Sequence, residues 1–129
     1  MAIRVNFEAK LEISETTGEG KELGKADWNG KNDEQQNGGS FLQTIVAGST
    51  DVLVDLNGLS DGALVGIKTD QEISIKKNSA AGEAWTVKPL GVGALSGIFI
   101  VTTTGVSSLY VSNSGSLDAE VTFVFAGAA

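Results

Sequence analysis

Residues 3–13 read IRVNFEAKLEI, and every second side chain in this stretch is apolar. Residues 117–125, LDAEVTFVF, show the same alternation near the end of the chain. Successive side chains of a β-strand point to opposite faces, whereas a helix needs apolar groups three or four residues apart. Both stretches are therefore predicted to be strands, and the first would extend for about 35 Å at roughly 3.3 Å per residue. Their apolar faces comprise Ile3, Val5, Phe7, Ala9, Leu11 and Ile13 in the first stretch and Leu117, Ala119, Val121, Phe123 and Phe125 in the second.

Shorter runs rich in Val, Ile and Thr lie between these two stretches, and Gly, Asn, Asp or Ser residues separate them. They predict strands at 41–47, 50–56, 63–69, 71–77, 84–89, 97–103 and 106–112. No window of the sequence combines a helical period with helix caps. The chain is thus expected to be all-β. Its 129 residues suit one domain over 1–129, a jelly-roll-like antiparallel β-sandwich of about eight or nine strands.

Residues 15–39 interrupt this succession of predicted strands, because they combine six glycines and nine charged residues with few large apolar groups. The composition predicts a long loop or arm, a kind of segment that is uncommon inside a compact domain. Two interpretations stay open. Trp28 either folds back onto the sheet of its own chain or anchors an arm that becomes ordered against a neighbouring subunit.

The candidate partner-binding residues are apolar side chains that these segments offer to another protein. An edge strand such as 3–13 carries unpaired backbone groups that could pair across a subunit boundary. The candidates are Trp28, Leu23, Ile3, Val5, Phe7 and Tyr110.

The composition excludes several kinds of chemistry. The chain has no His and no Cys, which removes a Ser–His–Asp triad, a cysteine nucleophile and the usual zinc, haem and iron–sulfur sites. Its net charge of −7 opposes binding to nucleic-acid phosphates. Gly18, Gly20 and Gly24 have the wrong spacing for a dinucleotide fingerprint. We therefore expect no enzymatic activity, no cofactor and no nucleic-acid partner.

Two acidic clusters could in principle bind calcium, which prefers oxygen ligands. They comprise Asp27, Asn29, Asp33 and Glu34 in one cluster and Asp51, Asp55, Asn57 and Asp61 in the other. Neither matches the EF-hand pattern, and Asp or Asn near Gly is more typical of turns. No metal site is predicted.

Two aromatic residues, Trp85 and Tyr110, lie in the shorter predicted strands. Trp85 lies in a short alternating run and is predicted to be a core residue rather than a platform for a ligand. Tyr110 points away from Leu109 and Val111, so both faces of its strand carry apolar bulk. Either a partner or the second sheet of the sandwich could cover it.

The N-terminal residues MAIRVNFEAK lack the apolar core of a signal peptide. No apolar stretch reaches the roughly 18 residues of a membrane helix. We expect a soluble chain without a membrane partner.

The segment from about residue 40 to 125 resembles small β-sandwich structural proteins of tailed bacteriophages. The resemblance rests on GSTDVLVDL at 48–56, KTDQEISI at 68–75, VSSLYVSN at 106–113 and the final alternating strand. Within that group the chain is most similar to head decoration (cementing) proteins.

This resemblance implies a non-enzymatic virion protein, assembled in the host cytoplasm, that binds capsid or tail subunits and stabilises the particle. It also implies a homotrimer that binds the major capsid protein or another virion protein. The alternative is a carbohydrate- or receptor-binding β-sandwich, which should show an aromatic platform or calcium dependence.

Overall fold

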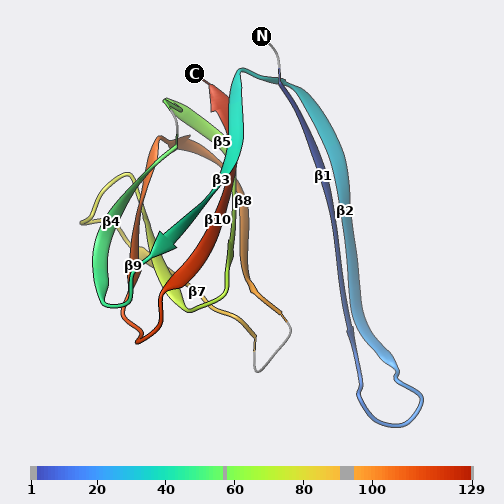
Figure 1. Cartoon of the computed structure of the whole chain (residues 1–129). Coiled ribbons are helices and arrows are strands. Elements are labelled where there is room, and N and C mark those ends of the chain that lie inside the picture. Colours follow the sequence, from blue (N-terminus) through green and yellow to red (C-terminus); the bar gives the residue numbers. More distant parts are fainter. Residues whose placement is uncertain (1–2, 57, 91–94, 129) are drawn as a thin grey trace. The chain divides into compact units, whose positions relative to one another are not determined.

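The computed structural model describes residues 3–56, 58–90 and 95–128, which form ten β-strands and no helix (Figure 1). The chain divides into two compact units, Met1–Gln35 and Gln36–Ala129. All strand pairs within them are antiparallel. The all-β prediction is confirmed.

The first unit is a long two-stranded ribbon of β1 (Ile3–Ser14) and β2 (Glu22–Gln35). Gly18 and Gly20 have positive φ angles of 69° and 68° in the turn between the strands, a conformation that glycine adopts without steric cost. The Glu15 amide donates a hydrogen bond to the Lys21 carbonyl at 2.8 Å, which closes the turn. The strand predicted at 3–13 is confirmed as β1.

A long loop or arm was predicted over 15–39, and the loop alternative is wrong for residues 22–35 and 37–39, which lie in strands. Glycine and charged residues have low intrinsic β-propensity, but strand formation depends largely on the neighbouring strand and its side chains. β1 offers a full row of backbone partners to β2. Only residues 15–21 connect the two strands.

The second unit consists of eight strands in two four-stranded sheets. The strands are β3 (Asn37–Ile45), β4 (Ser49–Asp55), β5 (Asp61–Thr69), β6 (Ile73–Lys77), β7 (Ala84–Val87), β8 (Gly97–Val106), β9 (Ser108–Asn113) and β10 (Ala119–Ala128). The sheet orders are β3-β10-β5-β8 and β4-β9-β6-β7. This is the order of a jelly roll, in which strands cross repeatedly between two sheets. The sandwich and each strand predicted between 41 and 125 are confirmed, with ends that differ by a few residues. The prediction of one domain over 1–129 stays a prediction.

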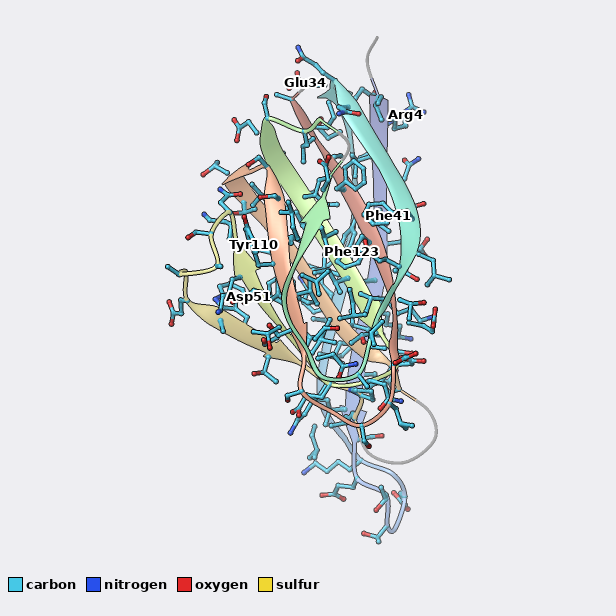
Figure 2. All side chains as sticks on the ribbon, turned by 60° about the vertical axis from the view of Figure 1, so that its left-hand side comes forward. Arg4, Glu34, Phe41, Asp51, Tyr110 and Phe123 are labelled. Carbon is cyan, nitrogen blue, oxygen red and sulfur yellow. The ribbon has the colours of Figure 1, made fainter. Side chains whose placement is uncertain are left out.

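The core lies between the two sheets. Phe123 is fully buried near its centre and stacks on Phe41, with ring centroids 5.2 Å apart (Figure 2). The alternation of β10 places Ala119, Val121, Phe123 and Phe125 inside, whereas Leu117 precedes the strand and is exposed. The other buried apolar residues of the core are Ile45, Val54, Leu56, Leu59, Val65, Ile67, Ile73, Ile75, Val87, Val106, Leu109 and Val111.

Asn113 is a fully buried polar residue at the end of β9. Its Nδ2 donates to the carbonyls of Ile45 at 2.9 Å and Leu117 at 2.8 Å, and its Oδ1 accepts from the Gly115 amide at 3.0 Å. A buried amide needs such partners to offset its lost hydration. Asn113 thus joins the end of β3 to the turn before β10.

Candidate functional site

The ribbon has one apolar face. Residues directly opposite in an antiparallel pair share a face, and the register pairs Phe7 with Gly30, Ala9 with Trp28, Leu11 with Ala26 and Ile13 with Gly24. Each of these pairs sets a large side chain against a small one. We call this surface the apolar ribbon face, defined by Ile3, Val5, Phe7, Ala9, Leu11, Ile13, Ala26 and Trp28.

Much of the apolar ribbon face is exposed. Trp28 is 46% exposed, and Leu11 and Ile13 are exposed to a similar degree. Ile3, Val5 and Phe7 are half-buried. A two-stranded sheet is a single layer that cannot bury its own apolar side, and an isolated hairpin is marginally stable in water. The face is therefore suited to contact with another apolar surface.

The opposite ribbon face carries charges of both signs. The Nε of Arg4 lies 2.5 Å from Oδ1 of Asp33, and Lys10 and Glu12 form an ion pair at 3.5 Å. Across the strands, Lys10 lies opposite Asp27 and Glu12 lies opposite Lys25. Exposed pairs of this kind contribute little stability. Their opposite signs nevertheless favour this register, which keeps the residues of the apolar ribbon face on one side.

The structure brings four of the six candidate residues onto one face, namely Ile3, Val5, Phe7 and Trp28. Leu23 is exposed beside the register shift near Ser14 and is not assigned to that face. Tyr110 belongs to the second unit. It is half-buried on the outer surface of its sheet, where its cross-strand partners are Leu53 and Lys76. Leu11 and Ile13 were not among the candidates, although the alternation in 3–13 already placed them on the same face.

The acidic clusters have local structural partners. Asp33 pairs with Arg4, and Asp51 pairs with Lys76 at 3.0 Å. Asp61 accepts from the Gly105 amide at 2.6 Å, while Asn57 lies outside the described residues. In the described part of the chain, no group of three or more acidic side chains is arranged to hold a metal ion.

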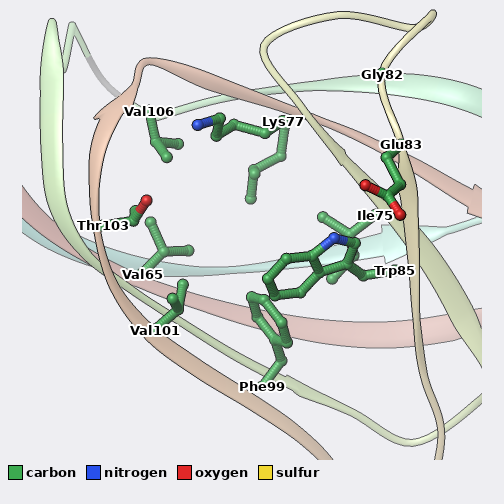
Figure 3. A pocket seen from close by; sticks show the side chains of 11 residues that line it. Val65, Ile75, Lys77, Gly82, Glu83, Trp85, Phe99, Val101, Thr103 and Val106 are labelled. Carbon is green, nitrogen blue, oxygen red and sulfur yellow. The ribbon is translucent and has the colours of Figure 1, made fainter.

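A cavity of about 360 Å³ opens between β7 and β8, which are edge strands of different sheets (Figure 3). Trp85 and Phe99 meet edge to face in its wall, with ring centroids 4.8 Å apart. Aliphatic side chains form most of the remaining wall, and a few polar groups join them. The full lining is Val65, Ile75, Lys77, Gly82, Glu83, Trp85, Phe99, Val101, Thr103, Val106 and Leu109.

The prediction that Trp85 is a core residue is wrong, because its side chain is 50% exposed. Trp85 lies opposite Ile75 and therefore points to the inner face of its sheet. However, β7 is the last strand of that sheet, so no further strand of the described residues pairs beyond it on the side of the ring. The alternation in the sequence reports the face of a strand but not its place in the sheet.

A scan against protein-family models and a search of curated proteins found no match to this chain. Among the described residues, no helix has the length and apolar character needed to cross a membrane.

Proposed function

We propose that this chain is a non-enzymatic structural protein of a tailed-bacteriophage virion, which binds capsid or other virion subunits and stabilises the particle. In this proposal the chain acts as a homotrimeric decoration protein. It needs no cofactor, and neither nucleic acid nor membrane is its partner.

The apolar ribbon face is the observation that carries this proposal. A strongly apolar surface on a charged protein is typical of a surface that another protein covers. The charged face of the ribbon meanwhile remains suited to water. The net charge of −7 would keep unassembled copies soluble until this face is covered.

The second unit supports the same proposal. Its jelly-roll order is one found in viral capsid proteins as well as in lectins. Fold alone does not establish function, so the proposal also depends on the resemblance of residues 40–125 to decoration proteins. Closed symmetry is the common outcome of self-association, and that resemblance favours three copies.

The alternative of a carbohydrate- or receptor-binding module receives some support from the half-exposed ring of Trp85. The cavity beside it is mainly apolar, whereas a sugar offers many hydroxyl groups that require polar partners. We therefore favour the structural role.

A matched pair of variants tests the proposal. Phe7→Lys introduces a charge on the apolar ribbon face, and Asn6→Lys introduces the same charge on the opposite face of the same strand. Light scattering after size-exclusion chromatography should give about three times the chain mass of 13.3 kDa for the wild type and for Asn6→Lys. Phe7→Lys should give a single chain, and it should fail to co-sediment with DNA-free phage heads that bind the wild type.

A folding control accompanies this comparison. No ribbon residue belongs to the sandwich core, so the β-sheet circular dichroism of both variants should persist. A wild type that stays monomeric at high concentration and does not sediment with heads would refute the proposal.

A further inference from the structure

The strand β8 presents a free edge that carries neither charge nor proline. It ends the sheet order β3-β10-β5-β8, so among the described strands only β5 pairs with it. Its sequence GIFIVTTTGV contains no charge and no proline, the devices that usually protect an edge from further pairing. Among the other edge strands, β4 carries Asp51 and Asp55, and β7 has only four residues. The edge strand β3 also lacks charge and proline, but it contributes no residue to the cavity. The backbone of β8 is thus open to an additional strand.

Both faces of β8 offer apolar contacts to such a strand. Ile98 and Ile100 on the outer face are 56% and 46% exposed. On the inner face, Phe99 and Val101 are half-buried and form a wall of the cavity. An additional strand would therefore gain apolar contacts on each of its faces.

The cavity lies where the side chains of an additional strand would point. That strand would run about 4.8 Å from β8, and its residue opposite Phe99 or Val101 would share their inward face. It would enter beside the Trp85 ring, which packs on Phe99, towards the aliphatic floor that Val65 and Ile75 provide (Figure 3). The cavity of about 360 Å³ has room for one large apolar side chain.

We propose that the β8 edge and this cavity together bind an extended segment of a partner protein, which adds as a strand and inserts one large apolar side chain beside Trp85. Main-chain hydrogen bonds supply affinity in this mode of recognition, and the pocket supplies specificity. This site shares no residue with the apolar ribbon face and does not depend on its role in assembly.

Other occupants fit these observations less well. A small molecule could fill the cavity but would leave the β8 edge unpaired. A β8–β8 pair between two copies would leave both cavities unfilled, because Phe99 and Val101 already form the walls of their own cavity. The side chain that fills the cavity therefore has to come from a strand whose inward-facing side chains do not already line a cavity of their own.

A labelled peptide provides a direct test. The probe is the peptide Lys-Thr-Val-Thr-Phe-Thr-Val-Thr-Lys carrying fluorescein, and binding to the full chain is followed by fluorescence anisotropy. Replacing its phenylalanine with alanine should weaken binding by about tenfold or more, because a large apolar side chain is no longer buried. Proline at two alternate positions should abolish binding, because the backbone pairing is lost.

Variants of the protein locate the binding site. Trp85→Ala should weaken peptide binding by about tenfold, while Leu53→Ala, at a similarly exposed apolar residue of β4 outside the cavity, should not affect it. Ile100→Lys on the β8 edge should weaken binding, whereas Leu42→Lys on the opposite edge strand β3 should not. Hydrogen exchange should show slower exchange of amides 98–104 when the peptide is bound.

Three results would overturn the proposal. The first is equal binding of the phenylalanine and alanine peptides, or no binding of either. The second is protection of amides 98–104 that rises with protein concentration without peptide, which would identify a second copy as the occupant. The third is binding of an oligosaccharide that Trp85→Ala abolishes while amides 98–104 stay unprotected. None of these results affects the outcome of the Phe7→Lys comparison. The proposed function and the proposed strand-binding site can therefore be refuted independently of each other.

Discussion

Replacing Trp28 with alanine should weaken association of the chain without unfolding the sandwich. A buried tryptophan side chain removes up to about 250 Å² from water. The 46% that is exposed in Trp28 then corresponds to about 115 Å² that a partner could cover. At about 25 cal/mol per Å² this contact contributes roughly 3 kcal/mol, or about a hundredfold in the association constant.

Sedimentation velocity over a concentration series measures this effect as a shift in the midpoint of assembly. Trp85→Ala is a suitable control, because Trp85 is similarly exposed, at 50%, but belongs to the sandwich. It should assemble as the wild type does. If Trp28→Ala and the wild type assemble at the same concentration, the apolar ribbon face is not the surface that associates.

Three further predictions concern the sandwich and the acidic residues. Asn113→Ala removes the side-chain hydrogen bonds to the carbonyls of Ile45 and Leu117 and to the amide of Gly115. Thermal unfolding should show a loss of about 3 kcal/mol, near 10 °C in midpoint, and an unchanged midpoint would contradict the role given to this side chain. Gly127→Ala adds a methyl group that would collide with the carbonyl oxygen of Asp61. Urea unfolding should detect a loss of about 1–3 kcal/mol, whereas Gly24→Ala, which meets no atom nearby, should cost little by the same measure. Calcium or a chelator should leave the thermal midpoint unchanged, since a ligand that binds only the folded state would raise it; a clear rise with calcium would favour the alternative of a carbohydrate- or receptor-binding module.

The positions of the strands could be predicted from the sequence because they depend on local patterns. Alternating side chains identified β1 and β10, and Gly, Asn and Asp residues marked the turns between the shorter strands. The segment 22–35 was missed because its residues are individually poor strand formers. It becomes a strand because β1 supplies its backbone partners, and such pairing is not visible in the composition of the segment itself.

The candidate site was predictable in part for the same reason. The shared face of Ile3, Val5 and Phe7 follows from the period of two. Trp28 joins that face only through the register that sets it opposite Ala9. A shift of one residue in that register would have moved Trp28 to the charged face.

The sequence by itself determined that this protein is all-β, where most of its strands lie, which side chains share a face within each strand, and that histidine and cysteine chemistry is absent. Only the tertiary structure decided that β1 pairs with β2 and that β3 and β5 flank β10. It also decided that β7 and β8 are edges with a cavity between them. The physical reason is that alternation encodes the two faces of one strand, whereas neighbours and edges arise from hydrogen bonds between residues far apart in the chain.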